Sequence, residues 1–212
     1  MQDDARRLPA VTRIRLATLE EVPELSAVLA RAFAPDAMMR WTMPADRREE
    51  RVQAFFEAFD GPSARHGWLW TTSDRGAVAL WVPPGTAAEF DELTFSLDGV
   101  RGLLGDAAER YDSFWAWAEG KRPSERHWYL DHLAVDEAHR GRGVGSALLE
   151  HGLALARAHD EPAFLCTSRP ENLPFYERHG FVVGEEGDAP GGGPHVWFLV
   201  TERATSAAPA EG

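Results

Sequence analysis

Residues 127–146 constrain the fold of this chain more than any other segment. They read HWYLDHLAVDEAHRGRGVGS, and the apolar run from 128 to 135 predicts a strand. A short polar stretch leads into a glycine-rich turn that begins at Arg140, and residues 144–159 then show helical spacing of apolar side chains. A strand, a glycine-rich turn and a helix N-terminus in succession indicate an α/β fold with an anion site.

The predicted anion site rests on the chemistry of the turn. Glycines allow a ligand to approach the main chain closely and permit positive φ angles. The first N–H groups of a helix have no intrahelical partners, and they lie at the positive end of the helix dipole. Arg140 and Arg142 add two fixed positive charges. The sequence therefore predicts a ligand with a phosphate or diphosphate group.

Spacing distinguishes this turn from two common phosphate-binding loops. The nucleotide P-loop, G-x-x-x-x-G-K-[ST], requires a lysine that this segment lacks. The dinucleotide pattern G-x-G-x-x-G is half met, since Gly141 and Gly143 fit but position 146 is a serine. The acidic residue expected about 20 positions further on would be Asp160 or Glu161, and both precede the next strand instead of ending it. Both loops are therefore disfavoured.

Two blocks of the sequence match one known family. Arg140, Gly143 and Gly145, after a strand that ends Leu-Ala-Val, resemble the acyl-CoA loop of the GNAT superfamily of N-acetyltransferases. A second block, over 163–183, matches the superfamily pattern N-x-x-F-Y-x-x-x-G-F at Asn172, Phe175, Tyr176, Gly180 and Phe181. With the segments RIRLATLEEVPEL and ARAFA, it resembles the puromycin N-acetyltransferase branch and, more distantly, the arylalkylamine N-acetyltransferases.

Pattern and resemblance together predict the architecture. Apolar periodicity predicts strands near 12–16, 67–72, 76–83, 127–135, 163–168, 181–186 and 195–200, and helices near 19–33, 45–59, 144–159 and 173–179, with helical pieces within 86–119. The resemblance implies a mixed, mostly antiparallel seven-stranded sheet with helices on both faces and splayed fourth and fifth strands. We expect a flexible N-terminus over 1–11, a single N-acetyltransferase domain over 12–202 and a disordered tail over 203–212.

The resemblance also implies a binding site for acetyl-CoA as cosubstrate. A backbone N–H near Leu133 would donate to the thioester oxygen, and the main chain of Ala134 and Val135 would pair with the pantetheine arm. Asn172 would bind the same arm, and Tyr176 would be the general acid for the CoA thiolate. The implied cofactor-binding residues are Leu133, Ala134, Val135, Arg140, Gly141, Arg142, Gly143, Val144, Gly145, Ser146, Asn172 and Tyr176. The alternatives are an ordinary strand at 133–135, a helix cap at Asn172 and a packed aromatic at Tyr176.

The sequence indicates a general base less clearly than it indicates the cofactor-binding residues. Strand alternation predicts one face with Tyr129, Asp131 and Leu133 and an opposite face with Trp128, Leu130 and His132. In the arylalkylamine relatives, histidines occupy the positions that match Tyr129 and Asp131, so their proton path does not transfer to this chain. Asp131 is the candidate base, with a salt-bridged structural carboxylate as the alternative. His132 is expected to be structural.

The acceptor side of the site is predicted from two loops. If the resemblance holds, loop 34–44 and turn 187–194 flank the acceptor channel, which places Asp36, Met38, Met39, Trp41 and the glycines 191–193 at its border. One of Trp115 and Trp117 should contact a loop or ligand, because residues two apart do not share a helix face. Cys166 lies within a predicted strand and is expected to be buried and unreactive.

Composition narrows the functional class. The formal charge is 22 − 34 = −12 and the pI is about 5.1, which argues against nonspecific nucleic-acid binding and suits a cationic amine. One cysteine excludes an intrachain disulfide, and no metal site is expected. The sequence has no membrane-length apolar run and no signal-peptide pattern, so we expect a cytoplasmic protein. We expect it to be a monomer or a homodimer.

The sequence thus predicts an acetyl-CoA-dependent N-acetyltransferase that acts on a primary amine of a small molecule, antibiotic-like or aromatic. No covalent enzyme intermediate is needed for direct transfer. The alternatives are a protein or peptide N-acetyltransferase, which would need an open groove with loop 34–44 folded away, and a non-catalytic acyl-CoA-binding sensor.

Overall fold

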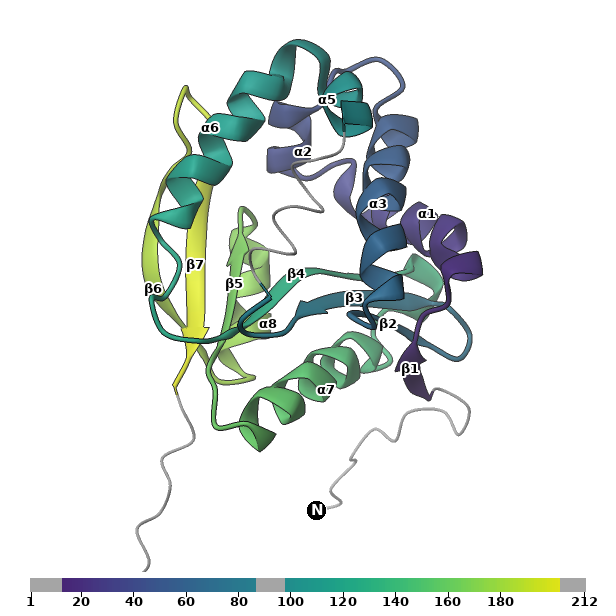
Figure 1. Cartoon of the computed structure of the whole chain (residues 1–212), viewed down its shortest axis with the longest axis vertical. Coiled ribbons are helices and arrows are strands. Elements are labelled where there is room, and N and C mark those ends of the chain that lie inside the picture. Colours follow the sequence, from purple (N-terminus) through teal and green to yellow (C-terminus); the bar gives the residue numbers. More distant parts are fainter. Residues whose placement is uncertain (1–12, 87–97, 203–212) are drawn as a thin grey trace, which may run out of the picture.

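The strands form one seven-stranded sheet in the order β1-β2-β3-β4-β5-β7-β6. The computed structural model describes residues 13–86 and 98–202, and the predictions for 1–11, 203–212 and part of 86–119 fall outside these ranges. The strands are β1 (Ile14–Leu16), β2 (Leu69–Thr72), β3 (Ala77–Val82), β4 (Trp128–Val135), β5 (Ala163–Thr167), β6 (Phe181–Asp188) and β7 (His195–Thr201) (Figure 1).

The pairing of β4 with β5 opens the sheet near its middle. All neighbouring strands are antiparallel except this pair, which is parallel. Its register covers only two residue pairs, Trp128 with Ala163 and Tyr129 with Phe164, although β4 continues to Val135. Beyond Tyr129, the β5 side of β4 therefore has no strand partner among the described residues. The predicted mixed sheet, mostly antiparallel and splayed between its fourth and fifth strands, is confirmed.

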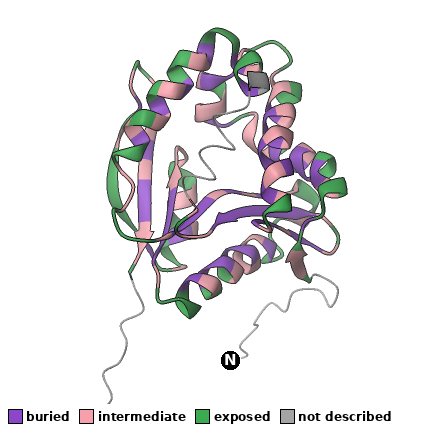
Figure 2. Ribbon diagram, in the orientation of Figure 1, coloured by how far each residue is buried: buried purple, intermediate pink, exposed green. Residues whose placement is uncertain are grey.

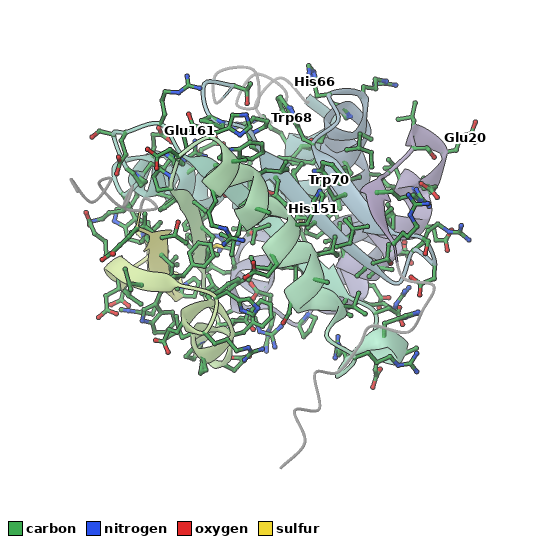
Figure 3. The ribbon with its side chains drawn as sticks, turned by 90° about the horizontal axis from the view of Figure 1, so that it is seen from below. Glu20, His66, Trp68, Trp70, His151 and Glu161 are labelled. Carbon is green, nitrogen blue, oxygen red and sulfur yellow. The ribbon has the colours of Figure 1, made fainter. Side chains whose placement is uncertain are left out.

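Helices cover both faces of the sheet. Two of them, α1 (Val22–Phe33) and α3 (Arg48–Arg65), lie on one face, and α7 (Val144–Ala158) lies on the other (Figure 1). Every residue of β3 is buried between these layers (Figure 2). On the α7 side, Trp70 of β2 lies beside His151 of α7, with ring centroids 4.2 Å apart (Figure 3). The core is therefore split into two apolar layers by the sheet.

Three segments differ from the sequence prediction. Segment 34–44, expected as a loop, contains α2 (Ala37–Thr42). This helix is too short for its apolar periodicity to be recognised. The helix expected over 45–59 is α3, which continues through Pro62 to Arg65. The third is the turn expected at 187–194, whose first two residues belong to β6.

Further helices lie around the open end of the sheet. The second described range, which begins at residue 98, opens with α5 (Asp98–Leu104) and α6 (Ala108–Glu119). Both helices lie above the sheet on the α3 side (Figure 1). The short helix α8 (Leu173–Glu177) follows β5. None of the helices in the described ranges is long and apolar enough to cross a membrane.

Candidate active site

An outer groove of about 680 Å³ runs along the end of β4 between α1 and α8. Its lining includes Leu133, Ala134 and Val135 of β4, Arg140 and Gly145 of the turn, and Asn172, Phe175 and Tyr176. The groove follows the part of β4 that β5 leaves unpaired. Backbone groups of β4 are therefore available there to an extended ligand.

The glycine-rich turn adjoins the groove and has the backbone geometry that its sequence predicts. A cavity of about 390 Å³ is lined by residues that include Arg140, Gly141, Gly143, Val144, Gly145 and Ser146. Gly141 and Gly143 have φ angles of +72° and +77°, a region that favours glycine. A Cβ at Gly145 would come 3.2 Å from Val135 Cγ2, so glycine lets α7 begin close to β4. The arrangement suits an anion at the N-terminus of α7. Arg142 is exposed and is not part of this lining.

An inner pocket of about 140 Å³ lies deeper, beneath α2, α3 and α6. Its walls are rich in aromatic side chains, namely Phe33, Phe55, Phe56, Phe59, Tyr111, Phe114, Trp115, Tyr129 and Tyr176. For comparison, an engineered cavity of about 150 Å³ in another protein binds benzene. The pocket therefore has room for about one aromatic ring.

The predicted acceptor border is only partly in place. Asp36, Met38 and Met39 line the inner pocket, because α2 folds over it. Trp41 lies instead against Gly193, where an added Cβ would come within 3.0 Å of its ring, and neither Trp41 nor the glycines 191–193 line the pocket. Of the two tryptophans on α6, Trp115 lines the pocket, whereas Trp117 packs on Phe198 with ring centroids 5.3 Å apart.

The outer groove and the inner pocket meet at a shared set of residues. These are Phe33, Leu133, Arg169, Asn172 and Tyr176. The phenol of Tyr176 is buried, which raises its pKa above the usual value of about 10, so it is protonated at neutral pH. Asn172 makes no side-chain cap to α8, and its Nδ2 lies 3.5 Å from Thr167 Oγ1. The helix-cap alternative for Asn172 is therefore not what the structure shows.

A β-bulge at Asp131 overturns the predicted alternation of β4. His132 pairs with Leu80 and Leu130 pairs with Trp81, so Asp131 is an extra residue with no partner on β3. Trp128 and Leu130 belong to the core layer under α7, and Leu133 packs with them, whereas Tyr129 belongs to the opposite layer. His132 faces that opposite layer too, with its ring 5.1 Å from that of Phe56. The prediction that Leu133 shares a face with Tyr129, and His132 with Leu130, is therefore wrong.

The bulge brings Asp131 and His132 into contact at the wall of the inner pocket. Nδ1 of His132 lies 2.9 Å from Oδ2 of Asp131, and Nε2 lies 3.2 Å from Oδ1 of Asp60 on α3. Burial lowers the pKa of His132, but the two carboxylates outweigh burial and raise it to about 10. Asp131 is thus paired, as one alternative held, and it also lines the pocket, as a base must.

Asp60 is the residue that sequence reasoning missed. A signal for it exists, because Val52, Phe56 and Asp60 follow each other at intervals of four on α3. This spacing places a carboxylate on the buried face of the helix.

The one cysteine belongs to the same pocket but has little nucleophilic character. Cys166 of β5 was expected to be buried but is half-buried, and it lines the inner pocket. Desolvation, together with the charge of Asp131, raises the pKa of its thiol to about 12. At neutral pH it is therefore a thiol and not the reactive thiolate. Among the residues that the structure describes, no group of His, Cys, Asp and Glu side chains has the arrangement of a metal site.

Comparison with known proteins defines the class. The family model of the Acetyltransferase (GNAT) family matches residues 36–181. The matched range contains the whole glycine-rich turn. It also contains every residue shared by the outer groove and the inner pocket except Phe33. The chain belongs to this family and is an N-acetyltransferase, an acyltransferase of a family that uses acetyl-CoA.

Solved structures support the same fold. A Corynebacterium glutamicum protein described as histone acetyltransferase HPA2 and related acetyltransferase is 27% identical with a TM-score of 0.69, and the match covers 93% of this chain and 99% of that one. A Drosophila melanogaster polyamine N-acetyltransferase that forms N-acetylagmatine is 15% identical, with a TM-score of 0.56 and coverage of 90% and 99%. A mosquito arylalkylamine N-acetyltransferase-like protein is 16% identical, with a TM-score of 0.51 and the same coverage.

Among curated proteins, a match covers only a short stretch of this chain. The matched protein is a probable serine/threonine-protein kinase from Dictyostelium discoideum, 32% identical over 60 residues. The match covers 28% of this chain and 8% of the kinase, so it carries no argument about activity.

Proposed function

We propose that this protein transfers the acetyl group of acetyl-CoA directly to the primary amine of a small molecule that carries an aromatic or similarly compact apolar group. The observation that carries the proposal is that the outer groove and the inner pocket share Leu133, Asn172 and Tyr176. A donor in the groove and an acceptor in the pocket would meet there. Proximity of two bound reactants is a large part of the catalysis of such a transfer.

The chemistry of the outer groove and of the adjoining turn suits acetyl-CoA. The backbone of residues 141–146 and the side chain of Arg140 would hold the diphosphate at the start of α7. The unpaired stretch of β4 at Leu133, Ala134 and Val135 would pair with the pantetheine arm, and Asn172 lies across the groove from it. Acetyl-CoA supplies an acyl thioester at the junction.

Two groups at the junction and one in the inner pocket divide the chemistry. Asp131 accepts the proton that the acceptor's ammonium group loses before its nitrogen attacks the thioester carbon. A backbone N–H near Leu133 donates to the thioester oxygen as negative charge develops there. Tyr176, held protonated by burial, donates its proton to sulfur as the C–S bond breaks and the C–N bond forms. The products are an amide and CoA with a free thiol.

The enclosed pocket favours a small acceptor over a protein. Loop 34–44 was expected to fold away from the site of an enzyme that acts on peptides, but α2 and α6 cover the inner pocket. Aromatic walls together with Asp36 and Asp131 suit a cation attached to a ring. The motifs that resemble the puromycin N-acetyltransferase branch support an antibiotic-like amine of this kind. The polyamine and agmatine enzymes among the structural neighbours act on amines as well.

A panel of amines tests the proposal. Release of CoA thiol from acetyl-CoA is measured with 2-phenylethylamine, its chain-matched aliphatic analogue, agmatine, puromycin and a short peptide with a free N-terminus, with a no-acceptor control. We expect the amines with a ring to have the highest kcat/KM. Faster transfer to the peptide would replace the proposal with a peptide N-acetyltransferase, and binding of acetyl-CoA without release on any amine would replace it with a sensor.

A further inference from the structure

Asp60 is an unexpected residue at its position. Its side chain has no exposed surface. On the same buried face of α3, Phe56 lies one turn before it and Ser63 one turn after it. A carboxylate transferred from water into such surroundings is costly unless another charge compensates it. The compensation here is the imidazole of His132, 3.2 Å away. An apolar residue would serve the core equally well or better, so stability alone does not explain Asp60.

The three charged residues form an array with a direction. Asp60 is fully enclosed, the side chain of His132 is 2% exposed, and that of Asp131 is 15% exposed and reaches the inner pocket. His132 contacts one carboxylate with each ring nitrogen. The array therefore runs from the core of the protein to the wall of the acceptor pocket.

The proton between His132 and Asp60 can lie on either residue without changing the hydrogen bond to Asp131. With a proton on each nitrogen of His132 and both carboxylates ionised, the three groups carry one net negative charge. If the proton on Nε2 moves to Asp60, the net charge stays the same and Nδ1 still donates to Asp131. In both arrangements a hydrogen bond from Nδ1 orients the carboxylate of Asp131.

We propose, building on the proposed function, that Asp60 and His132 are positioning residues that hold the Asp131 carboxylate turned toward the inner pocket, where it binds the acceptor's ammonium group and takes its proton. In that step an N–H bond of the ammonium breaks, the proton bonds to a carboxylate oxygen of Asp131, and the electron pair remains on nitrogen for attack on the thioester. Asp60 does not line the pocket, and His132, which does, acts through Asp131.

The groups around the array do not titrate in the working pH range. Tyr111 of α6, Tyr129 of β4 and Cys166 of β5 all have pKa values raised by burial and by the charge of Asp131, so they are neutral at pH 6–9. Arg122 lies over the ring of Tyr129, 4.7 Å from its centroid, and supplies a fixed positive charge. Ser26 of α1 adds a neutral hydroxyl near Asp60. A change in the array over this range can therefore be assigned to His132.

The first test needs neither acceptor nor acetyl-CoA. ¹⁵N-histidine NMR of the full chain follows the two ring nitrogens of His132 from pH 6 to 9, in the parent and in Asp60→Asn, with assignment by His132→Gln. We expect Nδ1 of His132 to stay protonated in the parent and neither ring nitrogen to change its protonation over this range, and we expect His132 to titrate between pH 6 and 8 in Asp60→Asn, because the variant lacks one of the two carboxylates that raise the pKa. Ordinary titration of His132 in the parent would overturn the proposal.

The second test measures kcat with the best amine of the panel across pH. The result is expressed as the ratio of the variant's kcat to that of the parent. In Asp60→Asn, His132 above its lowered pKa can donate from Nε2 to the amide oxygen that replaces the carboxylate, and its Nδ1 lone pair then repels Asp131. We expect the kcat ratio to fall about tenfold as pH rises from 6 to 8, a part of the roughly 100-fold or greater effect of a general base. His132→Gln should show a loss that is independent of pH.

Ser63→Ala is the matched control on the same buried helix face. Its hydroxyl donates only to Phe59 O within α3, and Ser63 does not line the pocket. We expect a ratio near one at every pH. Equal, pH-independent losses in Asp60→Asn and Ser63→Ala would reduce Asp60 to a structural residue. If no amine is acetylated by the parent, the proposed function fails, and the NMR titration still shows whether the array exists.

Discussion

Replacement of Gly143 by asparagine and by aspartate isolates the electrostatics of the proposed diphosphate site. Gly143 caps α7 with φ +77°, and both substitutes tolerate this backbone region better than other residues. The two side chains have nearly the same shape and differ by one charge. Any shared backbone strain therefore cancels in their comparison.

The expected difference can be estimated from Coulomb's law. A carboxylate about 6 Å from one phosphate charge, at an effective dielectric constant of about 20, is repelled by about 3 kcal/mol. At physiological salt the Debye length is about 8 Å, which reduces the term to roughly 1.4 kcal/mol, or about tenfold in Kd. Gly143→Asp should thus bind acetyl-CoA about tenfold more weakly than Gly143→Asn at that salt, and about a hundredfold more weakly at low salt.

Calorimetric titration with acetyl-CoA at two salt concentrations measures this difference, and melting curves without ligand supply the control. An aspartate at a helix N-terminus is favourable by about 0.3–1 kcal/mol, so ligand-free Gly143→Asp should melt no lower than Gly143→Asn. Stability and binding are thus expected to change in opposite directions. Equal acetyl-CoA affinity of the two folded variants at low salt would show that the diphosphate lies elsewhere.

Three further predictions rest on individual contacts. Tyr176→Phe should lower kcat at least tenfold with near-normal acetyl-CoA affinity, since it removes the proposed acid and little else; an unchanged kcat would exclude that role. Gly152→Ala should lower the melting temperature by several degrees, because its Cβ would lie 2.0 Å from buried Trp81, whereas Gly102→Ala, with no atom within 4 Å, should not. Cys166, with a thiol pKa of about 12, should resist iodoacetamide at pH 8 until the protein is unfolded; rapid alkylation of the native protein would contradict this.

Local sequence signals were sufficient for the parts of the fold that depend on neighbouring residues. The turn at 140–146 could be predicted because glycine at positive φ and a helix N-terminus are both encoded within a few positions. The helix α2 could not, because six residues give too little periodicity. Its place over the inner pocket depends on contacts from distant segments, such as Ser168 Oγ with Asp36 Oδ1 at 3.2 Å, and no local pattern encodes such a contact.

The contacts among Asp131, His132 and Asp60 escaped prediction because of the bulge in β4. Strict alternation assigns Asp131 and His132 to opposite faces, and it leaves Asp60 with no partner at all. One extra residue in the strand places Asp131 and His132 beside each other and turns His132 toward α3, where Asp60 lies. A polar Asp-His pair within an apolar strand and a carboxylate on an apolar helix face are each unfavourable alone. Together they compensate each other, so unpaired polar residues in two predicted core elements are better interpreted as a pair than as two exceptions.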